Sequence, residues 1–121
     1  MSGTADLGPE DFAPLRAGGE IGSNPIVLPA VGSTMDEVRR RAAGGAPHGT
    51  VVIADHQRRG RGRLGRPWVD EPGTSLLMSM LLECRRSGMA VLQAPMAVAL
   101  ATLKAIEPVP GPAQGAAFGL K

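Results

Sequence analysis

The sequence contains very few aromatic residues. Its 121 residues include one Trp and two Phe, and Tyr is absent. Aromatic side chains usually supply much of the buried area of a small domain, so any core here must be built from Val, Ile, Leu, Met and Ala. With 43% hydrophobic and 20% charged residues, the composition is still typical of a soluble globular domain.

Cysteine is also scarce, since Cys84 is the only one in the chain. A lone thiol cannot form an internal disulfide, and no second Cys or His stands near it to make a metal site. Residues 1–10 are polar and do not resemble a secretory signal. The most apolar stretch, residues 89–106, is interrupted by polar residues and Pro95 and is too short to cross a bilayer. We therefore expect a cytoplasmic protein with no metal centre and no membrane partner.

Gly and Pro, in contrast, are abundant, with 17 and 11 copies. Residues 1–24 combine them with acidic residues and lack periodicity, which predicts a flexible lead-in to a domain at residues 25–121. A short helix around Pro14–Arg16 is an alternative for part of this lead-in. A second Pro-rich segment, residues 107–114, is expected to be a connection.

Four apolar runs predict β-strands in the domain. They are an edge strand at Ile26–Val31, strands at Thr50–Ala54 and Thr74–Leu82, and the beginning of a further strand at Phe118–Lys121. Residues 55–73 between the second and third run are expected to form a long irregular loop.

Two helices are expected between these strands. Thr34 followed three residues later by Glu37 is typical of a capping box, and Gly at 44–45 should end this helix. The second helix lies within residues 89–106 and should begin near residues 94–95, because a proline is tolerated only in the first turn. One apolar face of it contains Leu92, Met96, Leu100 and Leu103. The element order predicts an α/β fold of the α+β type, a mixed sheet packed with helices.

Positive charge is concentrated in the long loop. The formal net charge is only +2, yet five arginines fall within nine residues, and without them the chain would be mildly acidic. They are Arg58, Arg59, Arg61, Arg63 and Arg66. Guanidinium groups match carboxylate and phosphate oxygens, and the intervening glycines allow the backbone to approach a ligand. The loop therefore predicts a local anionic ligand, with Trp68 as the adjacent aromatic surface.

The residues of the loop suggest three other interpretations. Gly60 to Gly65 spells G-x-G-x-x-G, but Pro67 and the lack of a following helix pattern argue against a dinucleotide-binding turn. RNA binding through the alternating Arg and Gly is a second interpretation, in which only Trp68 could stack on a base. A solvated surface loop is the third, and the loop alone does not exclude it.

The loop and its flanks resemble bacterial biotin–protein ligases. Gln57-x-x-Gly60-Arg61-Gly62-Arg63-x-Gly65-Arg66-x-Trp68 matches the family signature Q-x-x-G-R-G-R-x-G-R-x-W. Three shorter elements follow the family's order and spacing. They are Gly32-Ser33-Thr34, with Met35 where the family has Asn, the strand Thr74–Met80, which resembles N-L-Y-L-S-M, and Gly119-Leu120-Lys121, which resembles the opening of K-W-P-N-D. The resemblance covers residues 26–121.

The resemblance implies a class II synthetase-like catalytic domain and a ligase activity. Such enzymes use ATP, with Mg²⁺, to convert biotin into biotinyl-5′-AMP and transfer it to a lysine of a biotin carboxyl carrier protein domain of a carboxylase. A relative of lipoate–protein ligases is an alternative, as is a phosphate- or RNA-binding Arg-Gly module. No helix-turn-helix region is recognised, so DNA is not an expected partner.

The resemblance also implies roles for individual residues at the biotin site. Ser33 and Thr34 would contact the ureido end of biotin together with Gln57, although Ser33 is also interpretable as a helix cap. The remaining biotin contacts would come from Gly60, Arg61, Gly62, Arg63 and Lys121.

The nucleotide side would be held by the loop arginines. ATP and the adenylate would contact Arg61, Arg63, Arg66 and Trp68. Arg63 and Lys121 would be catalytic, because cations stabilise the charge that develops on the carboxylate and the α-phosphate. His48 and His56 match no motif and are expected to be incidental. The family's domain continues beyond the motif at Lys121, so we expect a truncated domain with little or no ligase activity alone.

Overall fold

A computed structural model describes residue 10, residues 19–23 and residues 25–108 of the chain. The fold divides into two compact units, Met1–Glu83 and Cys84–Lys121. Each unit is described by itself below.

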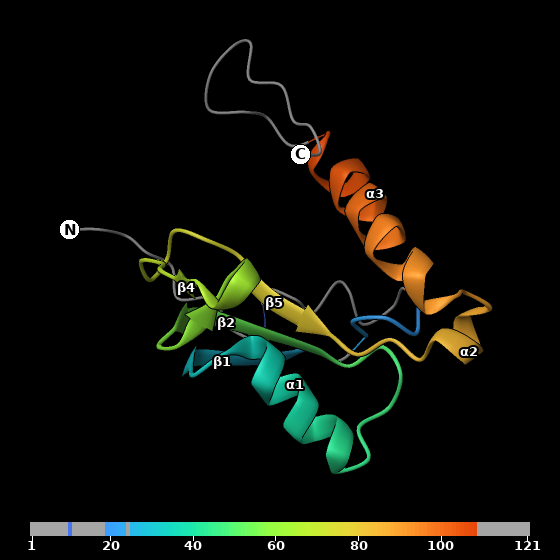
Figure 1. Cartoon of the computed structure of the whole chain (residues 1–121), viewed down its shortest axis with the longest axis horizontal. Helices are drawn as coiled ribbons and strands as arrows, with labels where there is room; N and C mark the ends of the chain where they lie inside the picture. Colours follow the sequence, from blue (N-terminus) through green and yellow to red (C-terminus); the bar gives the residue numbers. More distant parts are fainter. Residues whose placement is uncertain (1–9, 11–18, 24, 109–121) are drawn as a thin grey trace. The chain divides into compact units, whose positions relative to one another are not determined.

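A three-stranded mixed sheet organises the first unit (Figure 1). The central strand β2 (Val51–Gln57) pairs in parallel with β1 (Ile26–Val31) and antiparallel with β5 (Leu77–Met80). In this register Val52 lies opposite Ile26 on one side and Ser79 on the other. The mixed sheet confirms the predicted fold class, and β1 occupies an edge of this sheet as expected.

The boundaries of β2 and β5 differ from the sequence prediction. β2 continues through residues 55–57, which were assigned to the loop, because Ala30 and Val31 of β1 extend the parallel pairing to His56 and Gln57. β5 is shorter than the predicted strand at residues 74–82. The first residues of the predicted strand belong instead to a turn, in which the Thr74 N–H donates to the Glu71 carbonyl. Strand pairing, which sequence propensity does not contain, decides both boundaries.

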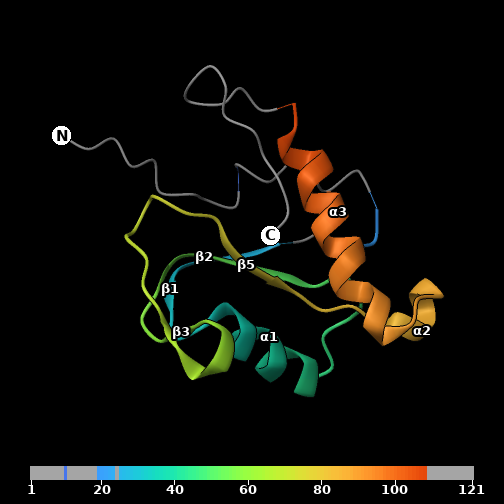
Figure 2. The ribbon, with the colours of Figure 1, turned by 45° about the horizontal axis from the view of Figure 1, so that its top comes forward.

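Helix α1 (Thr34–Ala43) contacts β2 and β5 (Figure 2). Its N-cap is Ser33, in extended backbone conformation, and no side chain makes a cap hydrogen bond there, so the predicted capping box is wrong. The Glu37 carboxylate instead accepts hydrogen bonds from Arg40 and Arg41. The helix ends at Gly44 as predicted.

The core of the first unit is aliphatic, as the shortage of aromatic residues requires. The side chain of Val38 from α1 is buried against the sheet, and four consecutive residues of β2 are buried. The buried hydrophobic residues are Val31, Val38, Val51, Val52, Ile53, Ala54 and Leu77.

The arginine-rich segment is more regular than predicted. Its strands β3 (Gly60–Arg61) and β4 (Pro67–Trp68) pair antiparallel and form a short hairpin. A 3₁₀ turn, η2 (Arg63–Gly65), forms the tip, and the Gly62 N–H donates to the Arg66 carbonyl at 2.7 Å beneath it.

The second unit consists of short helical elements in the described range. These are α2 (Cys84–Ser87), the 3₁₀ turn η3 (Val91–Gln93) and α3 (Ala94–Ile106), which begins where Pro95 predicted. Of the predicted apolar face, Leu92, Met96 and Leu100 are exposed and Leu103 is partly buried.

Three other expectations about the chain ends lie outside the described residues. They are the helix around Pro14–Arg16, the strand at Phe118–Lys121 and most of the connection at residues 107–114. Within the described residues, no helix has the length and apolar character needed to cross a membrane.

Candidate functional site

A cluster of three hydrogen-bonding side chains joins α1 to both neighbouring strands. The Thr34 hydroxyl lies 3.0 Å from Oε1 of Gln57, at the end of β2, and 2.8 Å from Oγ of Ser79, in β5. The backbone N–H of Thr34 also donates to Gln57 Oε1, at 2.8 Å. Thr34 is buried, and so is Ser33 beside it.

The donors in this cluster can be assigned by elimination. A backbone N–H only donates, so the Gln57 carbonyl must face Thr34 and its amide nitrogen must face the other way. The Thr34 hydroxyl donates to that same carbonyl and therefore accepts from Ser79. The cluster thus holds the Gln57 side chain in one orientation and leaves its two amide N–H groups directed away from Thr34.

Gly60 is required by this arrangement. A Cβ at position 60 would lie 2.9 Å from Nε2 of Gln57 and 3.0 Å from the carbonyl oxygen of Trp68, both too close for van der Waals contact. Gly60 therefore lets β3 pack directly against Gln57. The resemblance assigned it to ligand contact, whereas in the structure its first role is to permit this packing.

A cavity of about 230 Å³ opens beside the cluster. It combines the polar groups of Thr34 and Gln57 with apolar side chains from α1 and β5. Its lining consists of Ser33, Thr34, Met35, Gln57, Arg61, Trp68, Leu76, Leu77, Met78 and Ser79. We call this the first cavity. Five of the predicted site residues line it, together with Ser79, which the sequence did not indicate.

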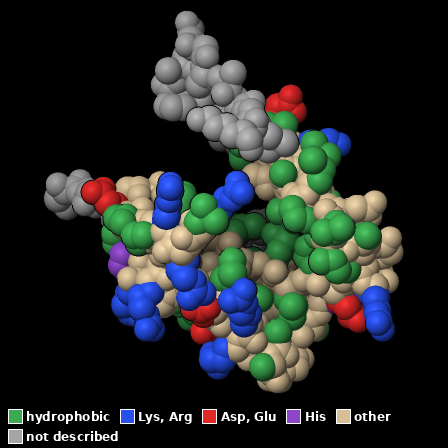
Figure 3. All heavy atoms as spheres, in the orientation of Figure 1, with side chains coloured by type: hydrophobic (Ala, Val, Ile, Leu, Met, Phe, Trp, Pro, Cys, Tyr) green, Lys and Arg blue, Asp and Glu red, His purple; other side chains and the backbone are tan. Residues whose placement is uncertain are grey.

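Arg61 lines this first cavity and is held by a carboxylate. Its Nη2 donates to Oδ1 of Asp36, in the first turn of α1, at 2.5 Å. The hydrogen bond from Arg61 holds the pKa of the Asp36 carboxyl below its ordinary value, with smaller contributions from the charges of Arg39 and Arg59. Figure 3 shows Lys and Arg side chains gathered around carboxylates on this face.

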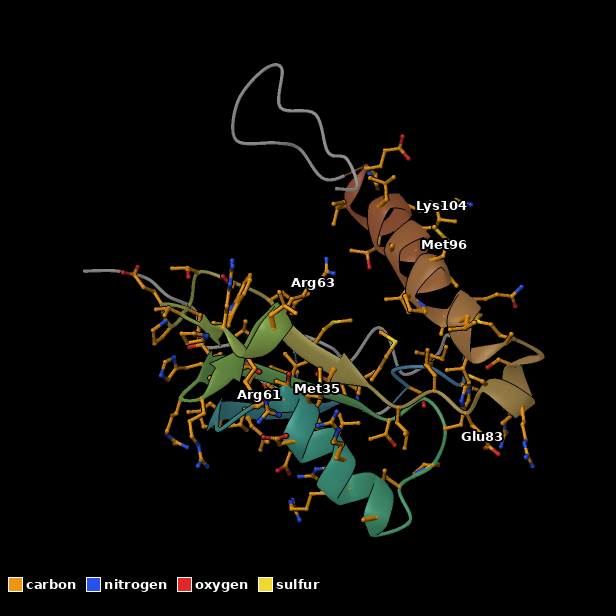
Figure 4. All side chains as sticks on the ribbon, in the orientation of Figure 1. Met35, Arg61, Arg63, Glu83, Met96 and Lys104 are labelled. Atoms are coloured by element: carbon orange, nitrogen blue, oxygen red, sulfur yellow. The ribbon has the colours of Figure 1, made fainter. Side chains whose placement is uncertain are left out.

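The other predicted arginines lie around a second cavity. This cavity, of about 410 Å³, is lined by Gly62, Arg63, Leu64, Arg66, Pro67 and Trp68. In Figure 4, Arg61 lies beside Met35 at the start of α1, whereas Arg63 extends from the hairpin away from both. Trp68 lines both cavities, of which the first is also lined by Arg61 and the second by Arg63 and Arg66.

The hairpin is fastened to the end of β2 by an almost fully buried carboxyl group. The Asp70 side chain is 1% exposed, and its Oδ2 lies 2.9 Å from Nδ1 of His56. Its Oδ1 accepts the backbone N–H of Gln57 at 3.3 Å. His56 therefore has a structural partner that the sequence analysis missed. A histidine and an aspartate 14 residues apart across a loop gave no signal in the sequence.

His48 also has a structural role. Its Nδ1 accepts the backbone N–H of Glu83 at 2.9 Å, which ties the turn after α1 to the segment after β5. It lines a third cavity, of about 480 Å³, together with Arg40 and Arg41. None of the predicted site residues lines this third cavity.

Two further expectations concern Lys121 and a metal ion. Lys121, the second predicted catalytic residue, is not among the described residues, so the structure does not place it. Among the residues that are described, no group of three or more His, Cys, Asp and Glu side chains could hold a metal ion.

Comparison with known proteins gives one family. The model of the biotin/lipoate A/B protein ligase family matches residues 28–118. The bifunctional ligase/repressor BirA of Bacillus subtilis is 32% identical over 91 residues, which cover 75% of this chain and 28% of that protein. The biotin–[acetyl-CoA-carboxylase] ligase of Mycobacterium tuberculosis is 34% identical over 92 residues, which cover 69% of this chain and 32% of that protein. The chain thus spans about a third or less of the length of these relatives.

Proposed function

Because this chain belongs to the biotin/lipoate A/B protein ligase family, we propose that it is the part of a biotin–protein ligase that binds biotin and one side of its adenylate. The full reaction would join the biotin carboxylate to AMP from ATP and then pass biotin to a lysine of a carrier protein domain. The relatives whose names state a biotin substrate support biotin over lipoate.

The observation that carries the proposal is the fixed hydrogen-bond cluster in the first cavity. A ureido group has one carbonyl acceptor and two N–H donors in a rigid ring. The amide N–H groups of Gln57 supply donors for the carbonyl, and the hydroxyl oxygens of Thr34 and Ser79 supply acceptors for an N–H. The apolar part of the lining, which includes Leu77 and Trp68, fits the rest of a bicyclic ligand.

The arginines on either side of Trp68 suit the charged part of the ligand. Arg61 faces the cavity proposed for biotin, where it would meet the carboxylate. Arg63 and Arg66 line the neighbouring cavity, which we assign to the phosphate and nucleoside of the adenylate. Two anions held side by side by these cations would react more readily, because positioning and charge neutralisation lower the barrier. Arg63 is then the residue that neutralises the α-phosphate, and Lys121 would add a second cation. The Mg²⁺ expected with ATP would be held mainly by the phosphates.

Calorimetry on the full 121-residue chain tests the proposal. Biotin is expected to bind, whereas lipoate and a generic RNA oligonucleotide are expected to bind at least roughly tenfold more weakly, a difference of about 1.4 kcal/mol. Tighter binding of lipoate would move the chain to the other branch of its family. Binding of the oligonucleotide alone would favour the Arg-Gly module. A biotin-dependent release of pyrophosphate from ATP then measures how much of the first chemical step the chain performs.

A further inference from the structure

Asp36 stands at a position that neither the family signature nor the proposed biotin contacts include. It lies in the first turn of α1, and its carboxylate and the guanidinium of Arg61 are both about half exposed, at 50% and 49% of the side chain. Arg61 comes from β3, 25 residues further along the chain. The pair therefore joins the hairpin to the helix at the mouth of the first cavity.

The Arg61 guanidinium retains donors for a ligand in this position. An arginine has five N–H groups in a planar fork, and the bond to Asp36 uses one donor on Nη2. Within the described residues, Asp36 is the hydrogen-bond partner recorded for the Arg61 side chain. An unrestrained arginine side chain samples many rotamers. A carboxylate that holds one end of the guanidinium fork reduces the side-chain conformational entropy that is lost when a ligand binds.

Charge around Asp36 also favours an anion. Arg39 lies 3.7 Å from the same carboxylate oxygen, and Arg59 is close enough to influence it. Three arginines thus surround one carboxylate, so the group keeps a net positive charge after Asp36 is neutralised. Asp36 can hold Arg61 without cancelling the field that attracts a ligand carboxylate.

We propose that Asp36 is a positioning residue, which holds the Arg61 guanidinium at the mouth of the first cavity so that it meets the carboxylate of the bound ligand. The inference rests on the proposed function, because the ligand carboxylate is that of biotin. Asp36 itself does not touch the ligand. Its effect is confined to ligands that carry a charged group at the position of Arg61.

Binding of biotin and of biotinamide, its neutral amide, to the full chain separates this role from a general effect on the fold. Asp36→Asn is expected to weaken biotin binding roughly tenfold, about 1.4 kcal/mol, and to leave biotinamide binding unchanged. Glu37→Gln removes the same charge one residue away and pairs with Arg40 and Arg41 instead, so it is the matched control. It should change neither affinity appreciably.

Two outcomes of the binding experiment would overturn the positioning role of Asp36. If Asp36 only competes with the ligand for Arg61, Asp36→Asn will bind biotin more tightly, and the inference is overturned. Equal losses for biotin and biotinamide would show that the substitution damages the cavity as a whole, which also overturns it.

A second measurement is independent of biotin. The carboxyl of Asp36 is titrated by NMR in the unchanged chain and in Arg61→Gln, where its pKa should rise toward the ordinary value of 3.8. No rise would show that the pair does not form and would refute the inference while leaving the proposed function standing. A rise together with no binding of either ligand would instead overturn the proposed function and, with it, the assigned role of Asp36.

Discussion

The two cavities that meet at Trp68 differ in how they are built. The first is lined by residues of α1, β2, β5 and the hairpin, and three of its lining residues (Ser33, Thr34 and Leu77) are buried. Its polar side chains are hydrogen-bonded to one another in the cluster of Thr34, Gln57 and Ser79. The second is lined by residues of a single hairpin, most of which are exposed. At its tip Leu64 is 91% exposed and has a positive φ of 58°, an unfavourable conformation for a leucine.

The difference indicates that the first cavity is the more preorganised for its ligand. A ligand part that is recognised by hydrogen bonds finds its partners already oriented, because moving any of them would break a hydrogen bond of the cluster. A ligand part that is recognised by charge finds arginines whose positions depend on one hairpin. We expect substitutions that disturb the cluster to affect folding and binding together, and substitutions at the tip of the hairpin to affect binding alone or to improve stability.

The largest effect is expected at Gly60, which packs against Gln57 of the first cavity and against Trp68, the residue that lines both cavities. Gly60→Ala places a methyl group 2.9 Å from the Gln57 amide nitrogen and 3.0 Å from the Trp68 carbonyl oxygen. We expect the free energy of unfolding, measured by urea denaturation, to fall by about 1–3 kcal/mol and biotin binding to be lost.

Gly62→Ala is the matched control for this substitution. Its new methyl group would lie 3.5 Å from the Arg66 carbonyl oxygen, an ordinary contact, and the backbone φ of −92° suits alanine. Stability should be unchanged or should rise by up to about 1 kcal/mol. Equal losses for the two variants would show that the packing of Gly60 against Gln57 and Trp68 is no tighter than that at the tip of the hairpin.

A smaller loss is expected from Thr34→Val, which keeps the shape of the side chain and removes its hydroxyl. The Gln57 carbonyl keeps the backbone N–H of Thr34, but Ser79 loses its acceptor, so unfolding should become easier by about 1–2 kcal/mol. Biotin affinity should fall roughly tenfold in calorimetry. Thr74→Val, which removes an exposed hydroxyl bonded to the Glu71 carbonyl, should change neither quantity measurably.

Asp70→Asn tests whether the hairpin depends on the end of β2. The amide can still accept the Gln57 N–H, but the bond to His56 is weakened. The free energy of unfolding, measured by urea denaturation, is therefore expected to fall by about 1 kcal/mol. Asp55→Asn is the control, because Asp55 accepts only the exposed Gly73 N–H among its described partners. If the Asp55 variant loses as much stability as the Asp70 variant, burial of the Asp70 side chain does not matter to the hairpin.

The smallest effect should have the opposite sign. Leu64→Asn relieves the positive φ, because Asn adopts the left-handed region more readily than Leu, and the lost side chain is exposed. The free energy of unfolding, measured by thermal denaturation, should rise by up to about 1 kcal/mol, and biotin affinity should be unchanged. A loss of stability would mean that Leu64 makes contacts that its exposure does not suggest.

Several parts of the fold could be predicted from the sequence because they depend on local patterns. The buried run at Val51–Ala54, the end of α1 at Gly44 and the start of α3 near Pro95 follow from β-branched residues, a glycine and a proline. The capping box was wrong because the Glu37 carboxylate has nearer partners in Arg40 and Arg41. The hairpin within the loop was missed because two-residue strands carry no periodicity.

The sequence by itself determined the family, since the spacing of Gln57, the loop arginines and Trp68 is specific without any coordinates. It also determined that the core would be aliphatic. Only the tertiary structure decided that Thr34, Gln57 and Ser79 share one cluster and that Asp36 holds Arg61. These contacts join residues 23 or more positions apart, and strand pairing and helix packing bring them together, so no local pattern could reveal them.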